Sequence, residues 1–309
     1  MTGKRLQNRI AGSRLALPVT VLYAALVWIV GGLLTDKLWI EFGLMVVTTY
    51  IMVELNNKNA LIHTYSRMVS CSFLVLTVAT GMIFHDISCC VLQLCWAAFY
   101  MLVFTVYQDK QAAGRVFYAF LCIGIGSTAF VHLLFFVPVL WLLLAFNLQS
   151  FSARTFWASV LGLMMPYWFV AAYCFYQDDM QLLTDHFAAL AVFQPLSDIA
   201  DMPLLQVVTF AFIALLGLLG TIHFFVTRIH DKIRTRILYD LFVIIEFACI
   251  AFIILQPAHY KQLMALLTVN TAPLIAHYLA LSHTRLSNIM FFVLSASAFL
   301  LTLFNLWTY

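Results

Sequence analysis

The sequence predicts an all-α fold, a polytopic transmembrane helical bundle, from three observations. Of the 309 residues, 64% are hydrophobic and only 9% are charged, whereas soluble domains carry about 25% charged residues. The mean hydropathy is +0.98. Apolar runs long enough for a hydrocarbon core of about 30 Å recur along most of the chain. We therefore expect one integral membrane domain over residues 1–309, with too little chain outside the bilayer for a soluble catalytic domain.

About ten to eleven membrane segments are expected, separated by short polar stretches. In chain order they are 15–34, 38–53, 68–84, 88–107, 116–128, 132–147, 156–176, 204–227, 237–255, 263–281 and 287–307. The first follows a basic stretch, is too long for a signal peptide and lacks a small-x-small cleavage site after it, so we expect a retained anchor. The seventh contains Pro166 near its middle, which predicts a kink.

Residues 116–147 form an uncharged stretch of 32 residues. As one helix it would be about 48 Å long, which is too long for one crossing and short for two. Lys110 and Arg115 precede it and Arg154 follows it, so both of its ends are expected on one side of the membrane. The stretch is therefore predicted to be a hairpin of two short helices. Whether this hairpin crosses the membrane fully or is re-entrant stays open.

The distribution of basic residues sets the orientation of this threading. With the hairpin and a cytoplasmic N-terminus, all Lys and Arg residues but two fall on the cytoplasmic side, and the two exceptions are Lys37 and Lys261. A single crossing at 116–147 would move every later loop to the other side and weaken the asymmetry. We therefore expect a cytoplasmic N-terminus and a C-terminus on the opposite side. Because the basic residues lie at helix ends, the net charge of +3 indicates no nucleic-acid partner.

The longest predicted loop, 177–202, is acidic and lies on the external side. Its weak candidates for catalytic groups are three carboxylates with a neighbouring imidazole: Asp178, Asp179, Asp185 and His186. Asp198 and Asp201 lie further along the same loop. Met180, Leu183 and Phe187 share one helical face, which predicts an amphipathic helix on the membrane surface. The alternative is that external loops simply tolerate acidic residues; no ligand spacing of a recognised kind is present, so neither a metal nor a cofactor is expected.

Polar residues inside the membrane segments form a second set of candidates. They would bind a substrate or relay protons, and they are His132, His223, Asp240, Glu246, Asn270 and His277. A charge at the depth of Glu246 costs about 2.5–3.5 kcal/mol on insertion scales, so it needs a reason. The alternative is an interhelical hydrogen-bond network, with Asp240 paired to Arg236 four residues earlier. His132 lies at the break of the hairpin, where freed backbone groups need protein partners or a water-filled cavity.

The run from Cys122 to Tyr176 carries a resemblance. It begins with a segment of small residues, followed by a bulky apolar segment and a short basic turn. A span with Gly162, Pro166 and Tyr167 comes next. This pattern resembles a family of polytopic inner-membrane proteins of Bacteroidota that has no established activity. The hairpin is also similar to a segment of multi-span glycosyltransferases that use polyprenyl phosphate. That similarity implies a catalytic carboxylate in the first external loop, where this chain has only Asp36 and, just beyond, Glu41, so such an activity is absent or has moved to the 177–202 loop.

Three hypotheses for function follow. In the first, the protein is a bacterial inner-membrane protein of envelope biogenesis that handles a lipid or lipid-linked sugar, such as a polyprenyl phosphate, and its C-terminus is periplasmic. In the second, it is a secondary transporter with Glu246 as the coupling carboxylate. In the third, it is a non-enzymatic scaffold that binds another membrane protein. The lipid bilayer is a partner in all three, and the sequence leaves open whether the protein is an enzyme.

Overall fold

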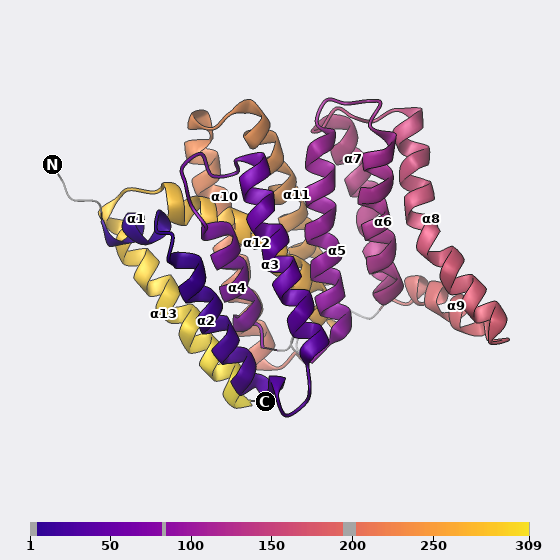
Figure 1. Ribbon diagram of the computed structural model, residues 1–309, viewed down its shortest axis with the longest axis horizontal. Helices are drawn as coiled ribbons and strands as arrows, with labels where there is room; N and C mark the ends of the chain where they lie inside the picture. Colours follow the sequence, from indigo (N-terminus) through magenta and orange to yellow (C-terminus); the bar gives the residue numbers. More distant parts are fainter. Residues whose placement is uncertain (1–4, 82–84, 194–201, 309) are drawn as a thin grey trace.

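The fold is a bundle of helices. The structure is a computed structural model that describes residues 5–81, 85–193 and 202–308. Within these ranges every regular element is a helix and none is a strand. Figure 1 shows the long helices standing side by side, in a row that runs from α2 (Ala16–Trp28) and α13 (Arg285–Thr308) at one end to α8 (Ala153–Tyr176) at the other. The predicted all-α class is confirmed.

Each predicted membrane segment overlaps a helix, although residues 82–84, at the end of the predicted segment 68–84, lie outside the described residues. Seven helices of the described residues are long and apolar enough to cross a membrane: Ala16–Leu33 (α2 and a π turn), Ile87–Val106 (α5, Ile87–Val103, and a 3-10 turn), α8, Leu204–His230 (α10, Leu204–Thr227, and a 3-10 turn), α11 (Ile233–Leu255), Pro257–Leu281 (a 3-10 turn and α12, Tyr260–Leu281) and α13. The remaining predicted segments are α3 (Trp39–Asn59), α4 (Met68–Ala79), α6 (Ala113–Ala129) and Val131–Phe146, a 3-10 turn followed by α7 (Val137–Phe146). The chain is therefore a multi-pass membrane protein. The short helices α1 (Leu6–Ala11) and α9 (Met180–Ala188) lie outside the predicted segments.

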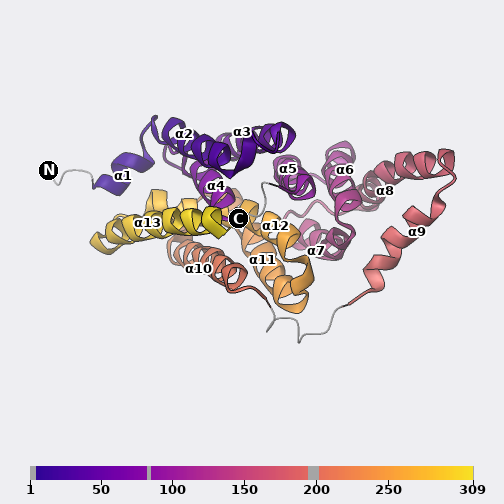
Figure 2. The same cartoon turned by 90° about the horizontal axis from the view of Figure 1, so that it is seen from below.

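The central element is α12. It packs against α4, α5, α10 and α11, and nearly all of its residues are buried. Its sequence is mostly apolar and its buried residues occur on every side of the helix, as expected for a helix enclosed by others. Figure 2 shows it between α4 on one side and α11 on the other. The polar side chains that α12 carries, among them Asn270 and His277, therefore point into protein.

The predicted hairpin at 116–147 is confirmed. The chain enters and leaves it at the same edge, because the backbone N–H of Gln108 donates to the Leu148 carbonyl at 2.8 Å and Ser152 Oγ donates to the Lys110 carbonyl at 2.9 Å. The break falls at Phe130, whose backbone is extended. The second half begins as a 3-10 turn, Val131–Phe136, and becomes α-helical only at Val137, so the predicted single helix from His132 was wrong in its first turn. Pro138 accounts for this start, because proline favours the first turn of an α-helix.

Small residues let α6 and α8 approach closely, as the series Gly124, Gly126, Ser127 and Ala129 predicts. A Cβ added at Gly124 would lie 2.8 Å from the Leu163 carbonyl oxygen and 3.1 Å from Pro166 Cδ. A Cβ added at Gly162 would overlap the Phe117 carbonyl in the same way. The Gly and Pro residues of the 122–176 pattern thus serve a helix–helix contact.

Figure 1 shows α1 beside the start of α13, whereas the end of α13 lies at the lower edge of the bundle. The side of the membrane on which each edge lies stays a prediction from the basic residues.

Candidate functional site

The acidic candidates lie on and before α9. Asp179 is the N-cap of this helix and accepts a hydrogen bond from the Leu182 N–H at 3.3 Å. Asp178 precedes it with a left-handed backbone (φ 55°). Both carboxylates and Asp185 are exposed. The predicted helix is thus present, and the structure gives Asp179 a capping role, which a helix start of this kind favours. Asp198 and Asp201 lie outside the described residues.

His186 is half-buried and joins α9 to the bundle. Its Nε2 lies 3.1 Å from the Ser127 carbonyl oxygen and 3.5 Å from Tyr167 Oη. Tyr167 Oη in turn donates to Ser127 Oγ at 2.8 Å. The imidazole therefore links α9 to α6 and α8 at the hairpin, and its predicted catalytic role stays a prediction.

Glu246 lies on α11 in the interior of the bundle and is 1% exposed. Asn270 Nδ2 donates to one of its carboxylate oxygens at 2.7 Å, and Thr271 Oγ1 donates to the other at 2.8 Å. The same amide nitrogen also donates to the Phe242 carbonyl at 2.7 Å. Glu246 and Asn270 lie at similar depth in consecutive spans, which predicts that they converge, and they do. Both contacting residues of α12, Asn270 and Thr271, approach the carboxylate as neutral donors.

The polar contacts continue from Asn270 into α5. Tyr100 Oη donates to Asn270 Oδ1 at 2.5 Å. Further along the same two helices, Gln93 Nε2 donates to Thr268 Oγ1 at 2.8 Å. On the opposite side the Glu246 carboxylate touches α10 at Gly217, where an added Cβ would overlap Glu246 Oε1. The carboxylate of Glu246 is thus enclosed between its own helix, α10 and α12.

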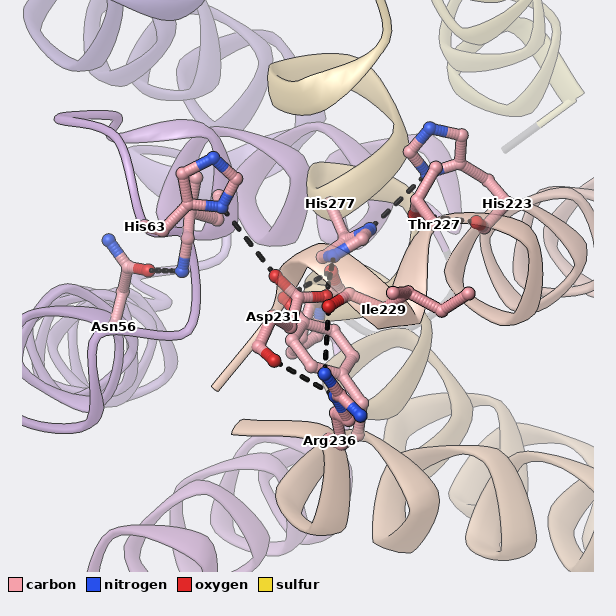
Figure 3. Close-up of polar contacts among 11 residues, drawn as sticks. Asn56, His63, His223, Thr227, Ile229, Asp231, Arg236 and His277 are labelled. Atoms are coloured by element: carbon pink, nitrogen blue, oxygen red, sulfur yellow. Dashed lines mark hydrogen bonds and ion pairs between the residues drawn. The ribbon is translucent and has the colours of Figure 1, made fainter. Parts of the chain in front are cut away.

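A second polar cluster centres on Asp231, in the short connection between α10 and α11. Its carboxylate lies between two imidazoles, with His277 Nε2 at 3.0 Å and His63 Nδ1 at 3.5 Å (Figure 3). The Asp231 and His277 side chains are 2% and 0% exposed, whereas that of His63 is 49% exposed. His223 Nδ1 on α10 lies 3.2 Å from His277 Nδ1 and extends the chain. The result is a line of four titratable groups that starts at a half-exposed histidine.

The environment of Asp231 favours its charged form. Burial raises the pKa of this carboxyl, but its hydrogen bonds and electrostatic interactions with His277 and His63 outweigh burial, so the pKa lies below its ordinary value. Sequence reasoning missed Asp231 and His63. The one available signal was that Asp231 is the single acidic residue in the basic stretch 228–236.

Because helices joined by short turns tend to be neighbours, His223, Asp240 and His277 are also predicted to converge. This prediction is correct for the two histidines and wrong for Asp240. Asp240 Oδ2 lies 3.7 Å from Arg228 Nη2, so its predicted pairing with Arg236 is also wrong. Arg236 donates to the carbonyls of Asp231 and Ile229, each at 2.8 Å. It is engaged there because the tight connection leaves carbonyls that need donors.

His132 is buried at the break of the hairpin, as predicted. Its ring lies against that of His259 with 3.9 Å between centroids, and the Phe130 ring is 5.2 Å away. Its Nε2 has no hydrogen-bond partner among the described residues. The contact links the hairpin to the turn that precedes α12.

A groove opens in the wall of the bundle between α2 and α13, with α4 and α12 as its floor. Its volume is about 430 Å³. Aliphatic and aromatic side chains form most of its surface, among them Val19, Val75, Leu279, Phe291 and Leu294. Ser72 and Ser295 are among its few polar residues, and Ser72 Oγ is buried without a hydrogen-bond partner in the described part of the chain. We call this the lateral groove.

Comparison with protein-family models, with curated proteins and with solved structures gave no match. The fold defines a multi-pass α-helical membrane protein.

Proposed function

We propose that the protein binds a lipid or lipid-linked sugar in the bacterial inner membrane, in a step of envelope biogenesis. The observation that carries this proposal is the lateral groove. It lies between helices long and apolar enough to cross a membrane, and its walls are almost wholly apolar. Within a bilayer such a groove fills with hydrocarbon, because no water is present at that depth to enter it.

Two arginines lie close in the chain to residues that line one end of the groove, although neither lines it. Arg9 directly precedes Ile10, which lines the groove, and Arg285 is the first residue of α13, which forms one wall. Both arginines are exposed. A phosphate head group placed here would meet positive charge, while its chain extended along α13. A long-chain lipid phosphate, such as a polyprenyl phosphate, has this shape and charge.

The acidic candidates on α9 stay a separate hypothesis. Figures 1 and 2 place α9 at the opposite end of the row from α2 and α13, so a chain in the lateral groove does not reach it. If Asp185 and its neighbours face a donor head group, Asp185→Asn removes an envelope-glycan phenotype at normal protein levels. A normal phenotype would exclude that role and leave the groove proposal standing.

The proposal is tested by labelling with a photoactivatable polyprenyl phosphate in native membranes. Cross-linked peptides are expected from α2 and α13. Ser295→Trp, which fills the groove, should abolish labelling, whereas Ala296→Trp, on the next residue of the same exposed stretch, should not. Equal labelling of wild type and Ser295→Trp would contradict the proposal.

A second candidate function is proton-coupled transport, and the burial of Glu246 among neutral donors favours it. Such a carboxylate can change protonation state during a transport cycle. Glu246→Gln should then leave folding intact and remove the pH dependence of uptake or efflux. A scaffold function instead predicts that a second membrane protein co-purifies and that all these substitutions are tolerated.

A further inference from the structure

A second depression lies on the other face of α2, between α2 and α3. Its volume is about 420 Å³. The lateral groove uses Leu15, Ala16 and Val19 of α2, whereas this one uses Arg14, Leu17, Pro18 and Val21, which lie on a different side of the same helix. We call it the α2–α3 trough. Its occupant is independent of the proposed function, because the two depressions share no lining residue.

The trough is polar at one end and apolar along its length. Arg14 lies just before the start of α2 and Arg67 just before the start of α4. Tyr65, in the connection that leads into α4, lines the same end of the trough. From Arg14 the wall continues through Leu17 to Val21, about 10 Å along the axis of α2. The antiparallel helix α3 supplies the opposite wall, which is lined by Val46, Thr49, Tyr50 and Val53.

Both arginines are available to an anion. Among the described residues no carboxylate forms a salt bridge with either of them. Arg67 is held in place, because its Nη1 donates to Asn57 Oδ1 at 3.3 Å and its guanidinium lies 5.6 Å from the centre of the Tyr65 ring. Glu54, the nearest acidic residue along α3, pairs with Lys58. Within the described residues, the mouth of the trough thus carries two uncompensated positive charges.

We infer that the α2–α3 trough binds an anionic glycerophospholipid. The phosphate lies between Arg14 and Arg67, whose planar guanidinium groups suit phosphate oxygens. One acyl chain follows Leu17, Pro18 and Val21. A basic pocket between membrane helices is a recurrent form of site for such head groups.

A lipid fits better than a free phosphate ion. The two arginines lead directly into an apolar channel between membrane helices, and an inorganic ion would leave that channel without an occupant. The hydroxyls of Tyr50 and Tyr65, both exposed near the mouth, suit the interface between head groups and chains.

The test uses the full chain in discs of phosphatidylcholine with a minor share of phosphatidylglycerol, followed by native mass spectrometry of retained lipid. Wild type should retain phosphatidylglycerol in preference to phosphatidylcholine. Arg14→Gln and Arg67→Gln should each lower that preference roughly fivefold, since one basic group near a membrane contributes about that factor. Arg154→Gln, an exposed arginine elsewhere on the same predicted side, is the matched control and should leave it unchanged.

Two further measurements separate the outcomes. Val21→Trp fills the apolar part, keeps both arginines and should also reduce retention of phosphatidylglycerol. If inorganic phosphate displaces the lipid while Val21→Trp has no effect, the site recognises the phosphate group alone and the inference is wrong. Equal losses in Arg67→Gln and Arg154→Gln would also overturn it. Ser295→Trp should leave this preference intact, so failure of the lateral-groove proposal is distinguishable from failure here.

Discussion

His277 Nε2 lies 3.0 Å from Asp231 Oδ2, and both side chains are almost fully buried. The contact ties the connection between α10 and α11 to the central helix α12. His63 approaches the same carboxylate from the connection between α3 and α4. One carboxylate therefore holds together three parts of the chain that are distant in sequence.

Asp231→Asn should destabilise the fold. The amide keeps the shape of the side chain and loses the negative charge that His277 and His63 face, so we expect a loss of about 1–3 kcal/mol. Thermal unfolding in detergent, followed by circular dichroism, measures this. Asp185→Asn, on an exposed position of α9, is the control and should unfold at the wild-type temperature.

The same carboxylate predicts a pH dependence of stability. Its pKa in the folded protein lies below the value of about 3.9 expected in the unfolded chain. Its contribution is therefore fully present above that unfolded value and is lost as the pH falls through the folded pKa. Wild type should lose more stability than Asp231→Asn as the pH falls below about 5. Parallel curves for the two proteins would show that Asp231 is not stabilised in its charged form.

Glycines on α10 should tolerate no side chain. A Cβ at Gly220 would lie 2.5 Å from the Leu274 carbonyl carbon and oxygen, and one at Gly217 would displace the Glu246 carboxylate. Gly220→Ala should cost about 1–3 kcal/mol through overpacking, and Gly217→Ala should disturb the Glu246–Thr271 hydrogen bond. Gly43→Ala on α3, where no atom lies within 4 Å of the new Cβ, is the matched control. Thermal unfolding of the three variants should find it neutral or stabilising, since alanine favours a helix.

His186 should hold α9 against the bundle. His186→Ala removes the contacts with Ser127 and Tyr167, so hydrogen exchange should become faster in Met180–Ala188 and stay unchanged in α12. Asp185→Asn, which alters the neighbouring exposed side chain, should leave exchange as in wild type. Unchanged exchange in His186→Ala would mean that α9 is held by its apolar face alone.

Hydropathy was sufficient to predict most of the architecture. The length of the uncharged stretch 116–147, together with Arg115 and Arg154 at its ends, led to the hairpin, because a bilayer limits how long one helix can be. The small residues Gly124, Gly126, Ser127 and Ala129 indicated a close helix contact for a similar reason, since only small side chains allow it. That Gly162 of α8 lies on the other side of this contact was not predicted. The candidate Glu246 was visible because a charge at mid-span is costly.

The contacts between the loops that connect the helices could not be predicted from the sequence. His63 and Asp231 lie in different loops, and helical periodicity carries no information about which loops meet. The error at Asp240 has the same origin, because spacing suggested the local partner Arg236, whereas Arg236 is occupied by backbone carbonyls and Arg228 is within reach. The lateral groove lies between α2 and α13. These helices are distant in the sequence, and no local sequence pattern predicts how they pack.

The measurement that tests the lateral-groove proposal most directly is mass spectrometry of the lipids that the protein retains in native-lipid discs. A polyprenyl phosphate or glycolipid is expected to be enriched over the surrounding bilayer in wild type and in Ala296→Trp, and to be lost in Ser295→Trp. Bulk phospholipid alone, in the same proportions in all three proteins, would contradict the proposal.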